Sequence, residues 1–276
     1  MIYFELCCSL PGDETQAEII IARLAEAGFE SFDQVSSELK AYIPAYLYGG
    51  HLKPLLESDI LEGISYSIAQ VADTNWNQVW ESNYEPVLIE GQCYVRAPFH
   101  DHRDDVAFEL LIEPKMSFGT AHHATTAMMI SYCLLEELHG KSLLDMGCGT
   151  AVLAILARMR GANPVLAVDN DLWAFENACE NIARNKTDDI VVLHGDDSIL
   201  EGRMFDVILA NINRNILLND MPAYTACLNT GGIMILSGFY FDDLKIITRK
   251  ALGLGLVQDG YKEQDHWTAA RFIRKD

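Results

Sequence analysis

Two glycines spaced two residues apart follow an acidic residue in the segment Asp145-Met146-Gly147-Cys148-Gly149. An apolar run ends at Met146 and a helical pattern begins near Val152, so the glycines are expected at a strand-to-helix turn. In open α/β sheets, such turns lie at the ligand-binding edge. Val152 replaces the third glycine of the dinucleotide fingerprint, which disfavours a pyrophosphate. Asp145, Gly147 and Gly149 therefore predict a site for a cationic or hydroxyl-bearing ligand, with a ligand-free tight turn as the alternative.

A second acid, Asp169, ends the next apolar run, about 20 residues after the glycines. A carboxylate at this place can accept hydrogen bonds from both ribose hydroxyls of an adenosine. Asn170 and Asp171 compete for this role, but Asp171 is better placed to cap the helix that starts near Trp173. After the following strand, the pair Asp196-Asp197 predicts either a contact to an adenine amino group or a solvated turn.

A third candidate, Asn211, ends the apolar run Phe205–Asn211 and so lies at the same edge of the predicted sheet. Its carboxamide oxygen can accept a hydrogen bond from an amine and hold the nitrogen lone pair toward a methyl donor. The alternative is an Asn-rich turn that caps the next helix.

A fourth feature is the segment Phe118–Thr126, in which small, hydroxyl and imidazole side chains lead into a helix. Free backbone N–H groups at the start of that helix are suited to a carboxylate, such as that of a methionine moiety. The alternatives are that Thr125 or Thr126 simply caps the helix, and that His122 and His123 are polar surface residues rather than a catalytic base.

From residue 118 onward, helices alternate with apolar runs, which predicts a mainly parallel sheet wrapped by helices and closed by two antiparallel strands. The expected elements there are helices over 125–138, 152–159, 173–185, 216–227 and 242–252, and strands over 142–146, 165–169, 190–194, 205–211, 233–237, 256–260 and 268–273. Residues 1–72 follow a β-α-β-β-α-β order that is typical of ferredoxin-like α+β domains. Residues 73–117 are a connector with an expected helix over 76–82, short strands over 87–89 and 94–97, and a polar loop over 98–105.

Length and composition narrow the function classes. A chain of 276 residues suits two domains, and its net charge of −20 disfavours nucleic acid and suits a basic partner. The absence of a long apolar run and of a signal peptide predicts a cytoplasmic protein without a membrane span. The seven cysteines show no Cys-x-x-Cys spacing, so we expect free thiols and no metal site. His100, Asp101 and His102 are accordingly expected in a solvated loop, not around a metal.

Taken in order, these motifs resemble the PrmA family, whose members methylate large-subunit ribosomal protein eleven. The resemblance is carried by EPKMSFGTAHHATTAM (113–128), LLDMGCGTAVLAI (143–155) and LANINRNIL (209–217). It extends to TNWNQVWESNYEPVLI (74–89) and DHWTAARF (265–272), and so covers essentially the whole chain.

The resemblance implies a Rossmann-like class I S-adenosylmethionine-dependent methyltransferase domain (118–276), preceded by the connector (73–117) and a ferredoxin-like substrate-recognition domain (1–72). Thr126, Gly147, Asp169 and Asn211 match the positions that contact S-adenosylmethionine in the family. Asn211 also stands where the family orients the accepting lysine ε-amine or N-terminal α-amine. The chain departs from the family at Ala121, His122 and Ala124, which replace Gly, Thr and Pro, and at Asn213-Arg214, which replace small residues.

Two other functions remain open at this point. One is a methyltransferase that acts on another protein or on a small molecule. The other is a non-catalytic module that binds a ribosomal or RNA partner, since ferredoxin-like domains often bind RNA. The acidic charge and the lack of a basic-aromatic strand pattern in residues 1–72 argue against the second.

Overall fold

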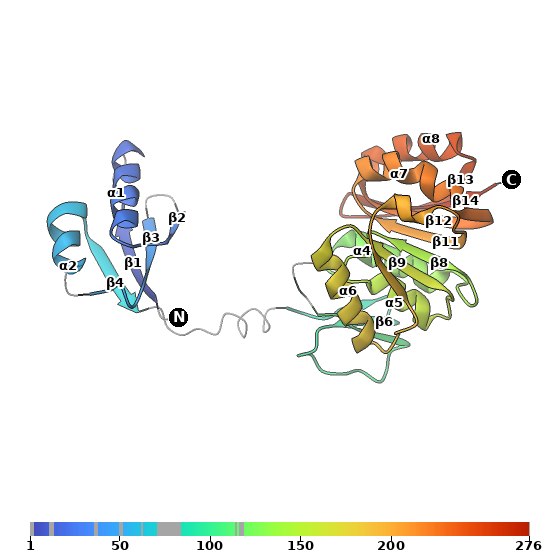
Figure 1. The fold of residues 1–276 in the computed structure, drawn as a ribbon, viewed down its shortest axis with the longest axis horizontal. Helices are drawn as coiled ribbons and strands as arrows, with labels where there is room; N and C mark the ends of the chain where they lie inside the picture. The colour runs from blue at the N-terminus through green and yellow to red at the C-terminus, as the bar shows by residue number, and fades with distance from the viewer. Residues whose placement is uncertain are drawn as a thin grey trace. The chain divides into compact units, whose positions relative to one another are not determined.

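A computed structural model describes residues 3–10, 14–35, 38–49, 52–61, 63–70, 84–113, 115 and 119–275. The chain divides into two compact units, Met1–Asn83 and Tyr84–Asp276, which are described separately (Figure 1). The helix expected over 76–82 and the start of the segment Phe118–Thr126 lie outside the described residues.

The first unit is a four-stranded antiparallel sheet in the order β2-β3-β1-β4 with two helical segments. Apolar side chains from the strands and helices, among them Leu6, Leu24, Leu39 and Leu56, form its core. The elements follow the expected β-α-β-β-α-β order, while the ferredoxin-like assignment itself stays a prediction. Their bounds are β1 Tyr3–Ser9, α1 Glu14–Glu26, β2 Ser31–Val35, β3 Glu38–Pro44, α2 Leu52–Leu55 with a π-helical continuation over Leu56–Ile60, and β4 Tyr66–Gln70.

A seven-stranded sheet in the order β10-β9-β8-β11-β12-β14-β13 forms the centre of the second unit. The five strands from β10 to β12 are parallel, and β14 pairs antiparallel with both β12 and β13. This confirms the predicted parallel sheet with an antiparallel end. The bounds are β8 Leu143–Met146, β9 Val165–Asp169, β10 Val191–His194, β11 Phe205–Asn211, β12 Leu228–Tyr240, β13 Leu256–Gln264 and β14 Trp267–Arg274.

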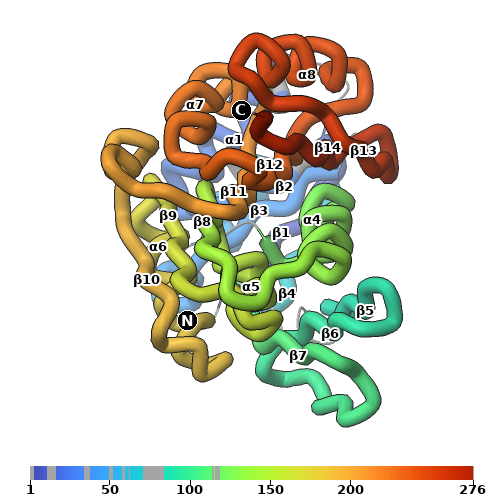
Figure 2. The backbone as a smooth tube through the Cα atoms, turned by 90° about the vertical axis from the view of Figure 1, so that its right-hand side faces the viewer, coloured from blue at the N-terminus to red at the C-terminus, as the bar shows by residue number. Residues whose placement is uncertain are grey.

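Helices cover both faces of this sheet because consecutive strand residues point to opposite sides. Leu143 of β8 belongs to the core shared with α4 (Ala124–Leu135), α5 (Val152–Met159) and α6 (Leu172–Arg184). Its neighbour Leu144 belongs to the core shared with α7 (Arg214–Ala226) and α8 (Leu244–Gly253). Figure 2 shows α6 beside β9 and β10 at one end of the sheet, and α8 beside β13 and β14 at the other.

A small sheet of β5 (Val87–Ile89), β6 (Cys93–Arg96) and β7 (Phe108–Leu111) belongs to the same unit. It packs on the face that α4 and α5 cover, through buried residues such as Cys93 and Leu110. The expected strands β5 and β6 are present, whereas β7 was not predicted; it pairs parallel with β6.

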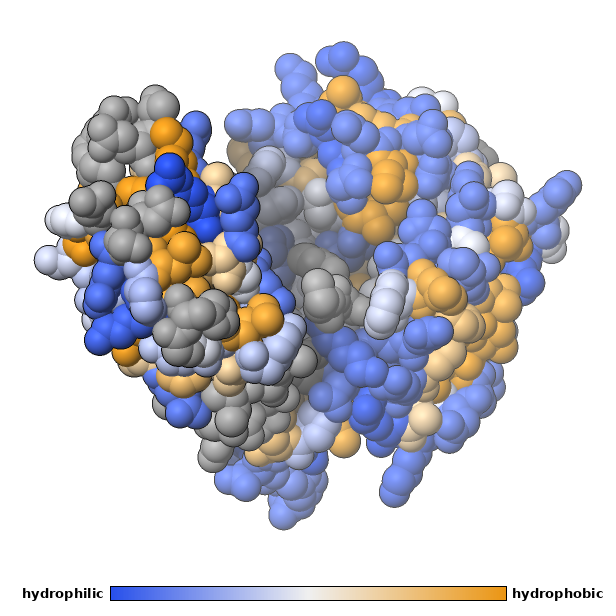
Figure 3. Space-filling model, turned by 60° about the vertical axis from the view of Figure 1, so that its left-hand side comes forward, coloured by the Kyte–Doolittle hydropathy of each residue, from blue (hydrophilic) through white to orange (hydrophobic). Residues whose placement is uncertain are grey.

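Hydrophilic side chains cover most of the second unit's face that is visible in Figure 3, with small apolar clusters between them. This matches a sequence with 40 acidic and 20 basic residues. Within the described part of the chain, no helix has the length and apolar character to cross a membrane.

Candidate functional site

The Gly-Cys-Gly turn joins β8 to α5 and is tied to the end of the neighbouring strand β9. The backbone N–H groups of Gly147 and Cys148 both donate to the carbonyl oxygen of Val168, at 2.8 and 3.0 Å. Gly147 has a φ of 70°, and a Cβ on it would lie 2.3 Å from Ile212 Cγ2. Both the conformation and the close approach require glycine at this position.

Asp145 is buried beneath this turn, with 1% of its surface exposed. Its Oδ2 accepts a hydrogen bond from the backbone N–H of Ala154 at 3.1 Å, in the first turn of α5. The N-cap residue Ala151 has a left-handed φ of 62° and no side-chain cap, so Asp145 supplies the acceptor that this helix start lacks. Burial, reinforced by the charge of Asp169, raises the pKa of Asp145 to about 7, although the Ala154 N–H opposes the shift. A direct ligand contact of Asp145 stays a prediction.

Asp169 ends β9 beside the glycine turn. Its Oδ2 accepts from the N–H of Gly149 at 2.8 Å, and its Oδ1 accepts from the N–H of Asp171 at 3.0 Å. Each carboxylate oxygen has a further lone pair, so both can still accept from a ligand hydroxyl. Asp171 caps α6 by accepting from the N–H groups of Trp173 and Ala174, which confirms its expected capping role.

Asn211 ends β11, opposite the buried side chain of Thr126 on α4. Its Nδ2 donates to Thr126 Oγ1 at 3.2 Å. Its Oδ1 is buried and has no hydrogen-bond partner among the described residues. Because an unpaired buried acceptor costs free energy, this oxygen is suited to a donor that arrives with a ligand.

These groups surround a cavity of about 900 Å³ at the carboxyl edge of the parallel strands. The predicted residues Gly147, Gly149, Asp169 and Asn211 line it. Thr126 and Asp145 lie behind it, the first against Asn211 and the second beneath the turn. The remaining lining residues are Asn170 and Asp171, which the sequence offered as competitors of Asp169, and Lys115, Trp173, Ala174 and Ile212, which the sequence motifs did not single out.

The start of α4 differs from the threonine-cap alternative. His123, and neither Thr125 nor Thr126, is the N-cap residue, and its Nδ1 accepts from the N–H of Thr125 at 3.3 Å. Two residues earlier, Ala121 adopts a left-handed φ of 69°. His122 contacts the carbonyl oxygen of Glu85 through Nε2 at 2.7 Å. Asn213 caps α7 and so fulfils the capping alternative for the Asn-rich turn, while Asn211 faces the cavity.

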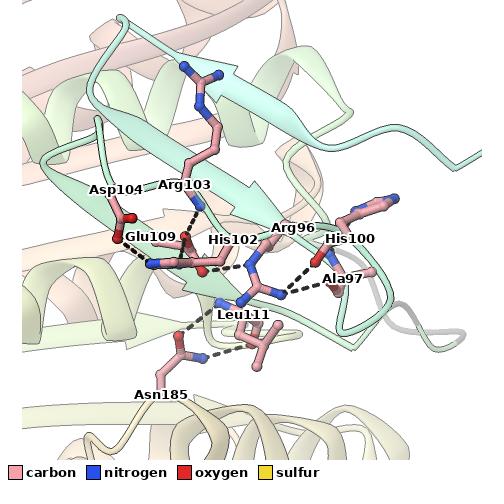
Figure 4. A network of polar contacts seen from close by, with 9 residues as sticks. All are labelled: Arg96, Ala97, His100, His102, Arg103, Asp104, Glu109, Leu111 and Asn185. Carbon is pink, nitrogen blue, oxygen red and sulfur yellow. Dashed lines mark hydrogen bonds and ion pairs between the residues drawn. The ribbon is translucent and has the colours of Figure 1, made fainter.

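The loop that contains His100 and His102 lies just before β7. Hydrogen bonds to Arg96, Asp104 and Glu109 hold it in place (Figure 4). His102 lies between Asp104 Oδ1 at 2.7 Å and Glu109 Oε2 at 2.6 Å, and these hydrogen bonds, first that to Asp104, raise its pKa. Arg96 bonds the other oxygen of Glu109, and Arg96 Nη1 donates to the carbonyl oxygen of His100. Within the described ranges, no three His, Cys, Asp or Glu side chains are arranged to hold a metal ion.

Known proteins resemble this chain in sequence and in fold. Residues 15–275 match the model of the family described as ribosomal protein L11 methyltransferase (PrmA). A protein of that name from Bacteroides fragilis is 46% identical over 99% of this chain and its own whole length, and one from Porphyromonas gingivalis is 48% identical over 94% of this chain and 91% of its own length. The crystal structure of a ribosomal protein L11 methylase from Lactobacillus delbrueckii subsp. bulgaricus superimposes with a TM-score of 0.65 at 26% identity, covering 70% of this chain and 100% of the other. The chain belongs to the ribosomal protein L11 methyltransferase (PrmA) family.

Proposed function

We propose that the cavity at Gly147, Asp169 and Asn211 holds S-adenosylmethionine, and that Asn211 orients an amine of ribosomal protein L11 for methylation. Family membership makes the chain an S-adenosylmethionine-dependent protein methyltransferase with L11 as its substrate. The observation that carries the assignment of Asn211 is its buried, unpartnered Oδ1 at the wall of the cavity.

The residues of the cavity fit the cofactor. A volume of about 900 Å³ is within the range of sites for molecules of this size. Asp169 offers acceptor oxygens for ribose hydroxyls, and the glycine turn allows close approach of the ligand to the backbone. Trp173, Ala174 and Ile212 supply apolar walls. Asp145 acts beneath the turn by fixing the start of α5, and Thr126 acts by holding Asn211.

When bound, S-adenosylmethionine would supply a methyl group activated by its sulfonium; in-line attack of the amine nitrogen on the methyl carbon would break the S–C bond and release the neutral thioether S-adenosylhomocysteine. The chain's own contribution is alignment. With Nδ2 tied to Thr126, the Oδ1 of Asn211 accepts an N–H of the neutral amine and fixes the direction of the nitrogen lone pair. The attacking nitrogen loses a proton to water after transfer. We propose lysine ε-amines and the N-terminal α-amine of L11 as acceptors, since both offer such a lone pair.

We further propose that residues 1–72 recognise L11, with 73–117 as a connector and 118–276 as the catalytic domain. Residues 1–72 hold three basic and eleven acidic residues, a balance that suits docking of a basic ribosomal protein. The same acidic excess disfavours direct contact with nucleic acid. We therefore propose that the enzyme binds L11 through protein contacts alone, in the cytoplasm. Deletion of residues 1–72 should abolish methylation of L11; undiminished activity of the truncated chain would overturn this division of roles.

The deciding experiment is transfer of labelled methyl from S-adenosylmethionine to purified L11, followed by intact mass measurement. Mass gains in steps of about 14 Da confirm methylation of that substrate. Cofactor binding without transfer to L11 would direct the search to another protein or a small molecule. Absence of both binding and transfer would leave only a non-catalytic binding role.

A further inference from the structure

A second cavity, of about 500 Å³, lies at the ends of β11 and β12. Asn213, Arg214 and Asn215 line it, and so do the aromatic residues Tyr240 and Trp267. None of the sequence motifs assigned a role to Tyr240, and the proposed cofactor site does not use it.

Two consecutive residues connect this cavity with the proposed cofactor site. Ile212 lines the first cavity, and its neighbour Asn213 lines the second. The backbone of Ile212 is fixed here because its N–H donates to Ser237 O at 3.2 Å. A Cβ on Gly238 would lie 2.2 Å from the carbonyl oxygen of Ile212, so β12 can approach this segment only through glycine. The second cavity therefore lies next to the wall of the proposed cofactor site at Ile212.

Three rings contact one another in turn, and two of them, Tyr240 and Trp267, line this cavity. The rings of Tyr240 and Trp267 are 4.2 Å apart at an interplanar angle of 32°, and those of Trp267 and His123 are 4.8 Å apart at 67°. Tyr240, at the outer end, is 51% exposed. His123, at the inner end, caps α4, the helix whose Thr126 holds Asn211. The three rings thus extend from the exposed Tyr240 to α4, the helix that positions Asn211.

The charged residues that line this cavity add little net charge. Arg214 Nη1 and Asp243 Oδ1 form an ion pair at 2.7 Å, so the two charges largely offset each other. Aromatic faces attract cations, and their apolar surface packs against methylene groups. A side chain with an alkyl stem and an amine at its tip has the chemistry that these rings offer to bind.

We propose that Tyr240 and Trp267 bind the substrate side chain that carries the acceptor amine, with its methylene stem against the two rings. This inference rests on the proposed function, because it takes Asn211 as the residue that receives the amine. The rings hold the amine's chain in line with Asn211 Oδ1, and they attract its nitrogen while it is protonated, the form in which an alkylamine arrives at neutral pH before it gives up the proton to react. The binding class is alkylammonium, and lysine is its form in a protein substrate.

The first test compares Tyr240→Ala with Tyr261→Ala. Tyr261 is a matched control because its exposed fraction, 49%, is close to the 51% of Tyr240 and because it lines neither of the two cavities. Loss of one cation–π partner should raise the KM for L11 by about two- to thirty-fold in Tyr240→Ala. The Kd for S-adenosylmethionine should stay at the wild-type value, and Tyr240→Phe should restore the KM because it keeps the ring. A KM in Tyr240→Ala equal to that of Tyr261→Ala would overturn the inference.

A second measurement does not depend on L11. In protein labelled with 5-fluorotryptophan, the ¹⁹F resonance of Trp267 is identified by its loss in Trp267→Phe. Butylammonium chloride should shift this resonance, and the shift should be weaker in Tyr240→Ala. If wild-type enzyme fails to methylate L11 while this shift is present, the acceptor assignment fails and the aromatic site stands. A shift no larger than that caused by sodium chloride at equal concentration overturns the aromatic site even where L11 is methylated.

Discussion

Asn211 Nδ2 donates to Thr126 Oγ1 at 3.2 Å, a bond that joins the end of β11 to α4 across 85 positions of sequence. This bond decides which atom of the carboxamide faces the cavity. With Nδ2 occupied, Oδ1 remains as a buried acceptor without a partner among the described residues. The proposed amine ligand is a donor, so the bond presents to it the complementary end of the side chain.

Replacing Thr126 should therefore affect turnover through Asn211. Thr126→Val keeps the shape of this buried side chain but removes the acceptor, so the carboxamide is free to rotate. We expect kcat on L11 to fall by about tenfold, since an unmade buried hydrogen bond costs about 1–3 kcal/mol. Thr126→Ser retains a hydroxyl and should recover most of the rate. A loss of cofactor affinity equal to the loss of kcat would instead favour a direct cofactor contact of Thr126.

Asn211 itself should matter more for turnover than for binding. Asn211→Ala removes the acceptor that orients the amine, and we expect kcat to fall by about a hundredfold or more. The affinity for L11, measured in the presence of S-adenosylhomocysteine, should change far less. Unchanged turnover in this variant would remove the proposed catalytic assignment of Asn211.

The gathering of Gly147, Gly149, Asp169 and Asn211 around one cavity was predictable from sequence. Each follows or ends an apolar run, and parallel strands bring their carboxyl ends to the same edge of a sheet. The number of residues between them along the chain matters little, because the parallel pairing of their strands brings all four to the same edge of the sheet. The wall residues Trp173 and Ile212 were not singled out, since an apolar residue beside a motif is equally typical of a core.

Other features depend on side-chain geometry that no spacing reveals. The bond between Thr126 and Asn211 needs α4 to pack over the end of β11. The role of Asp145 as acceptor for the Ala154 N–H follows from the left-handed conformation of Ala151, which leaves α5 without a side-chain cap. The strand β7 was not predicted because its four residues, Phe108–Leu111, do not alternate between apolar and polar side chains.

Asp169 is expected to control cofactor affinity. Asp169→Ala removes a charged acceptor for the ribose hydroxyls, which should weaken S-adenosylmethionine binding by about 1–3 kcal/mol. It also removes the partner of the Gly149 N–H, so thermal unfolding should be measured alongside calorimetric titration of the cofactor. Asp169→Asn keeps the shape and one acceptor oxygen, and should lie between the wild type and Asp169→Ala. A Kd for S-adenosylmethionine in Asp169→Ala equal to that of the wild type would show that Asp169 does not bind the ribose.

Alanine substitutions at two glycines with the same φ distinguish the cost of backbone strain from the cost of a steric clash. Gly147 and Gly140 both have a φ of 70°, but a Cβ on Gly147 meets Ile212 Cγ2 at 2.3 Å, whereas a Cβ on Gly140 has nothing within 4 Å. Gly140→Ala should cost about 1–2 kcal/mol of unfolding free energy from its left-handed conformation. Gly147→Ala should cost more than this and should also weaken cofactor binding. Equal losses in denaturant unfolding of the two variants would contradict the close packing of the turn on Ile212.

The buried carboxyl of Asp145 predicts a pH-dependent difference in stability. Burial raises its folded-state pKa to about 7, above the ordinary value of 3.8, so between these two pH values the folded state binds a proton that the unfolded state lacks. This group's contribution to stability therefore falls as the pH rises from about 4 to 7 and stays constant above that. Asp145→Asn has no proton to lose and its Oδ1 can still accept from the Ala154 N–H. Its unfolding free energy relative to wild type should then rise across this window, by an amount on the order of a few kcal/mol. Urea unfolding of both proteins at several pH values measures the difference, and a difference that does not vary with pH would show that Asp145 is ionised throughout.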